Sequence, residues 1–310
     1  MDYDIVIIGG GPGGLTAGLY AARGDMKTLL LEKLLPGGQA ATTYWIDNYP
    51  GFVEGVSGPQ LMMSMKDQAT RFGLEIKTDE VVGLEFLEDG FEVVGQEGKY
   101  TAHSVIISSG ATVAQLGVPG EEKLRGKGVS YCATCDGAFF RNEELVVVGG
   151  GDAAVEEGMF LTKFAKKVYI VHRRDRLRAA KAIQERAFKN EKIDFIWDTV
   201  VEEILGDQDV EGVRLKNLKT GETRELACKG VFIYVGNVPN SQFLKGKIDM
   251  DERGYVLTND QMETSRKGVF ACGDVRKKIL RQVVTACGEG ATAAFAAQQF
   301  VEEKKGIAYK

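Results

Sequence analysis

Two segments of this chain repeat one pattern: a short apolar run, a glycine-rich turn and a helical stretch. In the first, a mostly apolar run, residues 4–8, precedes Gly9, Gly11 and Gly14, which have the spacing G-x-G-x-x-G. Residues 15–23 then read as a helix and 28–31 as a second strand. The first glycine permits a tight turn, the second lets the backbone approach a pyrophosphate, and the third lets helix and strand touch. The pattern predicts a dinucleotide site at the helix N-terminus.

The second copy begins in the middle of the chain. Its mostly apolar run covers 144–148, and Gly149, Gly151 and Ala154 follow with the spacing G-x-G-x-x-A. Residues 167–171 then read as the next strand. At about 100–200 residues per domain, a chain of 310 residues suits two domains. We therefore expect an α/β protein with two Rossmann-like nucleotide-binding domains.

The residue that ends the second strand differs between the copies. Glu32 ends it in the first copy and can accept a hydrogen bond from a ribose hydroxyl. His172 holds the same position in the second copy, and Arg173 and Arg174 follow it. Guanidinium groups bind a 2′-phosphate that a carboxylate repels, so the first site suits the ADP half of FAD and the second suits NADPH. Arg178 is expected on the same helical face as Arg174. The alternative for the His172-Arg173-Arg174 run is a basic helix start that is exposed to solvent and binds no nucleotide.

Composition excludes several classes of protein. The 39 glycines show no three-residue period, which excludes collagen. A net charge of −5 argues against nucleic acid as the main partner. No run approaches the roughly 18 apolar residues of a membrane span, and the acidic start does not fit a signal peptide. Five cysteines, an odd number, do not suggest a secreted disulfide framework, so we expect a soluble protein of a reducing compartment, the cytoplasm.

Cys132 and Cys135 form a C-x-x-C pair between the two glycine motifs. A zinc site would need two more ligands, whereas the other cysteines are isolated and the chain has only two histidines. We therefore expect no metal. Two unrelated core cysteines remain an alternative, but a redox-active disulfide fits better in a chain that carries a flavin. Asp136 can move the proton that accompanies thiol–disulfide exchange.

The remaining cysteines and the second histidine carry no motif. Cys228, Cys272 and Cys287 are expected to be structural, because free cysteine behaves as a small buried hydrophobe. Cys272 follows an apolar run, and Cys287 lies in a small-residue helix expected over 285–297. His103 is expected at the edge of a strand.

Taken together, these motifs resemble those of the low-molecular-weight, bacterial-type thioredoxin reductases, which are class-II pyridine nucleotide-disulfide oxidoreductases. The resemblance covers essentially the whole chain. The sequences that carry it are the first glycine motif, Gly37-Gly38-Gln39, 48–51 (NYPG), 132–137 (CATCDG), 149–157 (GGGDAAVEE), 172–174 with Arg178, 236–240 (GNVPN), 268–275 (GVFACGDV) and 281–283 (RQV). Residues 108–111 (SSGA) and Cys287 depart from the usual pattern of this family.

The resemblance implies three-layer ββα domains, one of them discontinuous. Residues 1–113 and 246–310 would bind FAD, and residues 117–242 would bind NADPH and carry the C-x-x-C pair. Hinges are expected near 114–120 and 238–246, with a rotation of one domain against the other during turnover. The family also implies a homodimer that forms through the FAD domains.

The resemblance further assigns cofactor residues. Asp274 would hold the ribitol of the flavin, and residues 281–283 would begin a helix whose positive end faces the isoalloxazine ring. The full set expected for FAD is Gly9, Gly11, Pro12, Gly14, Glu32, Gly38, Gln39, Asn48, Gly110, Gly273, Asp274, Arg281, Gln282 and Val283. The set expected for NADPH is Gly149, Gly151, Asp152, Ala153, His172, Arg173, Arg174 and Arg178.

The activity implied is NADPH-dependent reduction of thioredoxin. NADPH would reduce FAD, and the flavin would then reduce the Cys132–Cys135 disulfide. Cys135 would face the flavin, Cys132 would attack the disulfide of thioredoxin, and Asp136 would act as acid and base. A reductase of the same fold that serves another thiol protein, or that takes electrons from ferredoxin, is the alternative. A flavoprotein oxidase of small dithiols and a nucleotide-sensing module fit the basic residues and the C-x-x-C pair less well.

Overall fold

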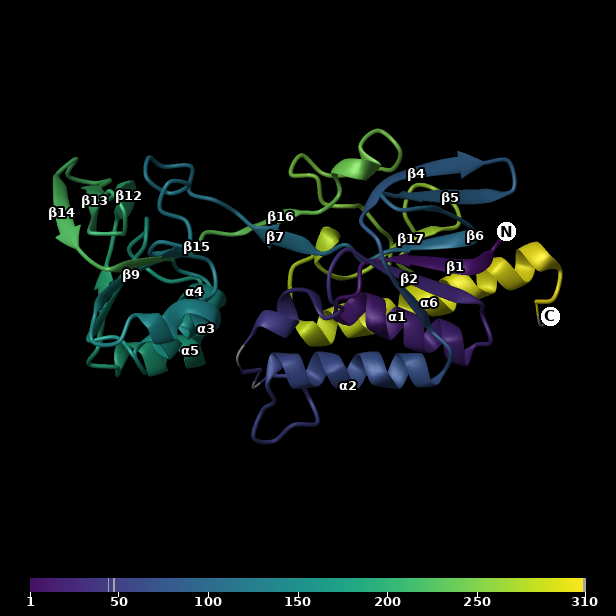
Figure 1. Ribbon diagram of the computed structural model, residues 1–310, viewed down its shortest axis with the longest axis horizontal. Coiled ribbons are helices and arrows are strands. Elements are labelled where there is room, and N and C mark those ends of the chain that lie inside the picture. The colour runs from purple at the N-terminus through teal and green to yellow at the C-terminus, as the bar shows by residue number, and fades with distance from the viewer. Residues whose placement is uncertain (44, 47, 309–310) are drawn as a thin grey trace. The chain divides into compact units, whose positions relative to one another are not determined.

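The computed structural model describes residues 1–43, 45, 46 and 48–308, which form two compact units. The first unit contains both chain ends, Met1–Thr112 and Val238–Lys310, and the second contains Val113–Asn237. The chain passes between them at β7 (Ala111–Val113) and β16 (Asn237–Pro239), which pair with each other. Figure 1 shows these elements along the chain.

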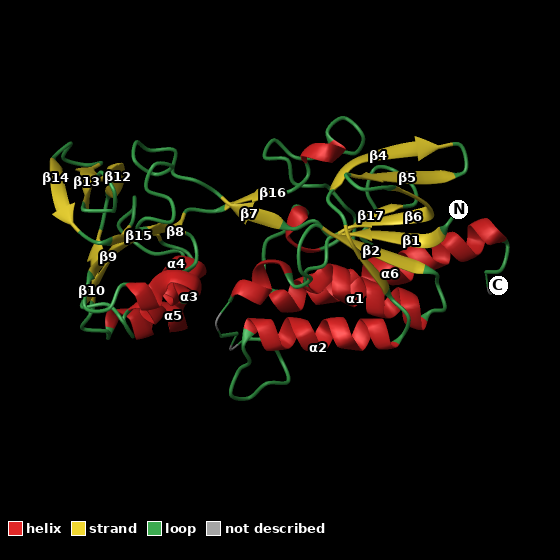
Figure 2. Cartoon of the chain, in the orientation of Figure 1, coloured by secondary structure: helices red, strands yellow, loops and turns green. Residues whose placement is uncertain are grey.

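The first unit is built on a mixed sheet in the order β3-β2-β1-β6-β5-β4, with β17 paired to β6. Strands β1, β2, β3, β6 and β17 run parallel, while β4 and β5 form an antiparallel hairpin joined to β6. Three helices, α1, α2 and α6, complete the unit (Figure 2). The bounds are β1 Tyr3–Ile8, α1 Pro12–Arg23, β2 Thr28–Glu32, α2 Gly58–Arg71, β3 Glu75–Thr78, β4 Val81–Leu87, β5 Gly90–Gly95, β6 Lys99–Ile107, β17 Val269–Ala271 and α6 Val283–Lys305.

Alternate side chains of β1 enter two separate cores, which explains its unbroken apolar run. Ile5 and Ile7 pack with residues of α1 and α6 on one face of the sheet. Val6 and Ile8 pack on the other face with residues of β4 and β5. A parallel strand that is buried on both faces has no polar side to show in its sequence. The unit therefore has three layers: helices, parallel sheet and hairpin.

The second unit repeats this layering. Its parallel sheet has the order β11-β10-β9-β15-β8, and an antiparallel sheet of β12, β13 and β14 forms another layer. The bounds are β8 Val129–Ser130, α3 Ala133–Asp136, β9 Glu144–Gly149, α4 Asp152–Leu161, β10 Lys167–Val171, α5 Lys181–Phe188, β11 Ile193–Ile196, β12 Thr199–Leu205, β13 Gly212–Asn217, β14 Thr223–Ala227 and β15 Gly230–Tyr234. The expected fold class, with two Rossmann-like units, is confirmed.

Several local boundaries differ from those expected. Residues 238–242 lie in the first unit, where Ser109 Oγ donates to the carbonyl of Asn240 at 2.7 Å and Asn240 Nδ2 donates to the carbonyl of Ser109 at 2.9 Å. His103 lies within β6, between the positions that pair with β1, and not at the edge of a strand. Among the described residues, no helix has the length and apolar character needed to cross a membrane.

Candidate functional site

The first glycine loop, between β1 and α1, has one open position among crowded ones. A Cβ added at Gly9, whose φ is +102°, would lie 2.4 Å from the carbonyl oxygen of Ser108. A Cβ at Gly14 would overlap the carbonyl oxygen of Gly9, so helix and strand are in contact there. At Gly11 an added Cβ would meet nothing within 4 Å. Gly11 is also the N-cap of α1, with Pro12 after it, so free space lies at the positive end of a helix.

Glu32 ends β2 beside this loop. Its Oε2 accepts a hydrogen bond from the amide of Gly10 at 2.7 Å. A cavity of about 280 Å³ adjoins it, with Gly9, Ser109 and Asn240 in its lining. A carboxylate has lone pairs for more than one donor, so the bond to Gly10 leaves Glu32 able to accept from a ribose hydroxyl.

Distant segments meet around the same loop. A Cβ at Gly38 would lie 3.2 Å from Cα of Gly11. Gln39 Nε2 donates to the carbonyl of Ala111 at 3.2 Å, next to Gly110, whose φ is +67°. Asn48 Nδ2 donates to Gln282 Oε1 at 3.0 Å, although 234 residues separate the two. The structure therefore brings the expected residues of both chain ends together in one unit.

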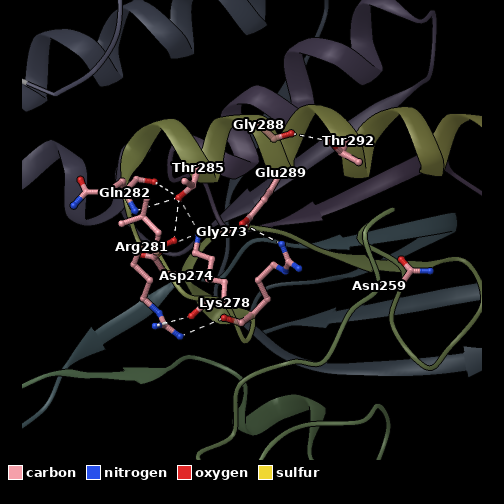
Figure 3. Close-up of polar contacts among 12 residues, drawn as sticks. Asn259, Gly273, Asp274, Lys278, Arg281, Gln282, Thr285, Gly288, Glu289 and Thr292 are labelled. Carbon is pink, nitrogen blue, oxygen red and sulfur yellow. Dashed lines mark hydrogen bonds and ion pairs between the residues drawn. The ribbon is translucent and has the colours of Figure 1, made fainter.

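Charged side chains that the sequence analysis did not single out surround the start of α6 (Figure 3). Glu289 Oε2 accepts from the amide of Gly273 at 2.8 Å, and Glu289 Oε1 pairs with Arg276 at 3.0 Å. Lys278 Nζ lies 3.2 Å from Asp274 Oδ1 and 3.3 Å from Glu289 Oε2. The Lys278 side chain is only 6% exposed. Because buried charges need partners, Lys278 and Glu289 fix the orientation of Asp274 and of the turn at Gly273.

The helix that Arg281, Gln282 and Val283 were expected to begin starts at Val283. Gln282 is its N-cap and forms a capping box with Thr285. Arg281 lies one residue before the cap, with its guanidinium carbon 4.2 Å from the ring centroid of Tyr255. The Arg281 guanidinium thus adds positive charge just before α6, whose first turn is already the positive end of the helix dipole.

The second glycine loop, between β9 and α4, repeats the open and crowded positions of the first. A Cβ at Gly149 would lie 2.5 Å from the carbonyl oxygen of Tyr234, whereas one at Gly151 would meet nothing within 4 Å. Gly151 is the N-cap of α4. Asp152, which follows it, accepts a hydrogen bond from the amide of Ala180 at 2.7 Å, and Ala153 is exposed.

His172 is buried beneath this loop, because a Cβ at Gly150 would lie 2.5 Å from its imidazole. Burial and then the charges of Arg178, Arg173 and Arg174 lower the pKa of His172 and favour the neutral ring. The three arginines are exposed. The expected helix through Arg174 and Arg178 is wrong: residues 172–180 form no helix, and Arg178 reaches the loop because its amide donates to the carbonyl of Gly150 at 2.6 Å.

The cysteine motif lies at the start of α3 in the second unit, with Cys132 directly before the helix. Cys132 is in a disulfide bond; the side chain of Cys135, its expected partner, lies outside the described residues. Ser130 Oγ accepts from the amide of Cys132 at 3.0 Å and donates to Asp136 Oδ2 at 2.6 Å. On another side, the hydroxyl of Tyr234 accepts from the amide of Ala133 at 2.9 Å. Ser130 and Tyr234 had no sequence signal, because their contacts depend on strands β8 and β15.

The other three cysteines are free. Cys228 and Cys272 are buried, and burial raises the pKa of each thiol to about 12, which makes both poor nucleophiles. Cys287 is half-buried; its Sγ lies 3.8 Å from the Tyr49 hydroxyl and 3.9 Å from the carbonyl oxygen of Pro12.

Comparison with known proteins agrees with this arrangement. The pyridine nucleotide-disulphide oxidoreductase family matches residues 3–290. Thioredoxin reductase of Peptoclostridium litorale is 52% identical over 307 residues, with 97% of this chain and 98% of that protein covered. The enzyme of Bacillus subtilis is 50% identical over 302 residues, with 97% and 95% covered. The crystal structure of Lactococcus lactis thioredoxin reductase superposes with a TM-score of 0.95 at 50% identity, covering 97% of this chain and 99% of that one. The chain belongs to the pyridine nucleotide-disulphide oxidoreductase family.

Proposed function

We propose that this protein is an NADPH-dependent flavoprotein that reduces the disulfide of thioredoxin. The observation that carries the proposal is the disulfide-bonded Cys132 beside Asp136, in the unit that holds the second glycine loop. The curated relatives at about half identity are thioredoxin reductases, and the protein uses FAD and NADPH as cofactors.

The residues of the first unit fit FAD. Gly11 leaves open space at the start of α1, and Glu32 is placed to accept a ribose hydroxyl. Asp274 pairs with Lys278 and would hold the ribitol, and the positive end of α6 would face the isoalloxazine ring. The remaining residues proposed to contact FAD are Gly9, Pro12, Gly14, Gly38, Gln39, Asn48, Gly110, Gly273, Arg281, Gln282 and Val283.

The residues of the second unit fit NADPH. Gly151 leaves open space at the start of α4, and exposed arginines at 173, 174 and 178 supply donors for a 2′-phosphate. Gly149, Asp152, Ala153 and His172 complete the proposed set. The bound cofactors supply the redox chemistry that side chains lack, namely a hydride from NADPH and an electron pair passed on through FAD.

The protein's own residues carry out the exchange with thioredoxin. The thiolate of Cys132 attacks one sulfur of the thioredoxin disulfide, that bond breaks, and a mixed disulfide forms while the departing thiolate takes up a proton. Cys135 then attacks the Cys132 sulfur, which re-forms the disulfide of the reductase and releases the second thioredoxin thiol. Asp136, held by Ser130, is placed to give and accept the proton.

The proposal also covers organisation and location. Residues 1–112 and 238–310 form the FAD-binding unit, residues 113–237 form the NADPH-binding unit, and the connecting strands β7 and β16 lie at the hinges. The protein works as a cytoplasmic homodimer, joined through the FAD-binding units. A second candidate, reduction of another thiol protein or with ferredoxin as donor, is weaker because the exposed arginines at the second loop suit a phosphorylated nucleotide.

Anaerobic titration tests the proposal. NADPH should bleach the bound flavin, and the reduced protein should then convert thioredoxin to its dithiol form. Cys135→Ser should keep reduction of the flavin by NADPH but lose reduction of thioredoxin, whereas Cys228→Ala, at a buried free thiol of the same unit, should keep both. Colourless protein, a flavin that NADPH does not reduce, or a Cys135→Ser variant that still reduces thioredoxin would overturn it.

A further inference from the structure

The basic segment that follows β10 is attached to the second glycine loop through its backbone. The amides of Arg178 and Ala179 donate to the carbonyl of Gly150 at 2.6 and 3.2 Å. The side chain of Ala179 is buried, whereas that of Arg178 is exposed. The backbone therefore lies against the loop, and the guanidinium is open to solvent, where a phosphate can reach it.

Two side chains hold the next peptide group, which joins Ala179 to Ala180. Its carbonyl oxygen, on Ala179, accepts from Gln184 Nε2 at 2.7 Å. Its N–H group, on Ala180, donates to Asp152 Oδ1 at 2.7 Å. Gln184 lies in α5 and Asp152 begins α4, so two helices form a clamp on one peptide group. Because a peptide group is planar, bonds to both of its polar atoms fix its orientation.

The clamp acts on a segment that forms no helix, residues 172–180. A helix holds its own peptide groups by hydrogen bonds between backbone atoms four residues apart, whereas this segment depends on bonds to its neighbours. Arg178 comes directly before Ala179, whose carbonyl the clamp holds. The direction in which the Arg178 side chain leaves the backbone therefore depends on Gln184 and Asp152 as well as on the carbonyl of Gly150.

We propose that Gln184 and Asp152 are positioning residues that set the preference of the second site for NADPH over NADH. By fixing the peptide group after Ala179, they direct the Arg178 guanidinium towards the 2′-phosphate. The inference rests on the proposed function, because it takes Arg178 as a contact of NADPH. It gives Gln184 a role without contact to the nucleotide, and it gives Asp152 a role through the backbone of Ala180.

The preference between the two nucleotides separates this role from other effects of Asp152. The 2′-phosphate is the chemical difference between NADPH and NADH, so the ratio of their dissociation constants isolates the contacts to it. Asp152 also places a carboxylate at the start of α4, where the pyrophosphate of either nucleotide is proposed to lie. Removing that charge acts on both nucleotides alike and cancels in the ratio. A changed ratio therefore reports on Arg178.

The test is calorimetric titration of the oxidised full-length holoenzyme with NADP⁺ and with NAD⁺, neither of which can reduce the flavin. Gln184→Ala should weaken NADP⁺ binding about fivefold, the effect of one lost hydrogen bond, and leave NAD⁺ binding unchanged. Asp152→Ala should shift the ratio in the same direction. Asp152→Asn keeps an acceptor oxygen for the amide of Ala180 and should keep the wild-type ratio. Gln208→Ala removes an exposed glutamine of the same unit and should match the wild type.

A second measurement needs no nucleotide. Trypsin should cleave after Arg178 about fivefold faster in Gln184→Ala and in Asp152→Ala than in the wild type, because a segment released from the clamp opens more often. Mass spectrometry of the fragment that begins at Ala179 gives the rate. Asp152→Asn and Gln208→Ala should be cleaved at the wild-type rate.

Two results would overturn the inference while Arg178→Ala itself shifts the ratio. One is a wild-type ratio in both Gln184→Ala and Asp152→Ala. The other is a Gln184→Ala effect that keeps its full size in an Arg178→Ala background, because the clamp would then not act through Arg178. If Gln184→Ala does not fold, the contrast between Asp152→Ala and Asp152→Asn decides.

Failure of the proposed function has a different signature. An Arg178→Ala protein with the wild-type ratio would remove Arg178 from the proposed contacts of NADPH, and the inference with it. Wild-type protein that fails to reduce thioredoxin would refute the proposed activity and leave the inference standing, since neither titration nor proteolysis needs thioredoxin.

Discussion

The two glycine loops share a backbone design and differ at the strand end beside it. In both loops a Cβ added at the second glycine, Gly11 or Gly151, would meet open space. A Cβ added at the first glycine would clash with backbone atoms. In the first loop the Glu32 carboxylate accepts the amide of Gly10, whereas in the second the His172 ring packs beneath Gly150 and exposed arginines follow. In the proposed function, the shared frame would receive a pyrophosphate, and the strand end would select which nucleotide carries it.

The largest effect is expected when the arginines beside the second glycine loop are removed. Arg173→Ala combined with Arg174→Ala should weaken NADPH binding by about 100-fold, because two charge-assisted contacts to the 2′-phosphate are lost. NADH binding should change little. The measurement is the dissociation constant of each nucleotide, with Arg224→Ala, an exposed arginine on β14, as control. Equal losses for NADPH and NADH would show that these arginines do not read the phosphate.

Substitutions at the third position of the glycine motif should change the free energy of unfolding by different amounts in the two loops. An added Cβ at Gly14 would overlap the carbonyl oxygen of Gly9, so Gly14→Ala should lower the free energy of unfolding by about 2–3 kcal/mol. The second loop already carries Ala154, and Ala154→Gly should cost only about 1 kcal/mol, the ordinary helix penalty of glycine. Urea unfolding of both variants measures the difference. A Gly14→Ala protein as stable as the wild type would contradict the close contact between α1 and β1.

Substitutions at the open positions, Gly11 and Gly151, should each weaken the binding of a different nucleotide. Gly11 and Gly151 have φ values of −71° and −92°, which alanine adopts without strain. Gly11→Ala should therefore fold normally but bind FAD about tenfold more weakly, and Gly151→Ala should do the same for NADPH. Flavin content and nucleotide titration give the two readouts. Either substitution acting on the other nucleotide would break the assignment of the loops.

Sequence periodicity predicted the elements that frame these loops because their signals are local. The apolar runs before Gly9 and Gly149 became β1 and β9, with bounds shifted by a residue. Helix α6 proved longer than expected, Val283–Lys305, because its polar C-terminal turns lack the small residues that marked the rest. Arg178 was misplaced because spacing alone cannot show that residues 172–180, directly after β10, form no helix.

The network around the start of α6 could not be predicted in the same way. Arg276, Lys278 and Glu289 look like ordinary surface charges in sequence, and they become informative only when folding buries them against one another. The same holds for Tyr234, whose partner Ala133 is 101 residues away. Long-range pairs of this kind leave no periodic trace, so the motifs predict where the sites lie but not which side chains hold them in place.

The smallest effect concerns the histidine that replaces Glu32 in the second loop. Burial and the neighbouring arginines lower the pKa of His172 in the folded protein, so the unfolded chain binds its proton first, near about pH 6.5. Stability therefore falls as pH drops from about 6.5 towards the folded pKa, and above that window His172 has no such effect. His172→Asn should flatten this slope, by about 1–2 °C in Tm across the window. Burial and then the charges of Lys304 and Lys305 also lower the pKa of His103, but that ring is half-buried and the charge of Asp4 acts in the opposite direction, so His103→Asn should flatten the slope less. The reverse ranking, in Tm measured from about pH 7 to about pH 5, would mean that the ring beneath Gly150 is protonated in the folded state, and that the second loop has a fourth positive charge beside its arginines.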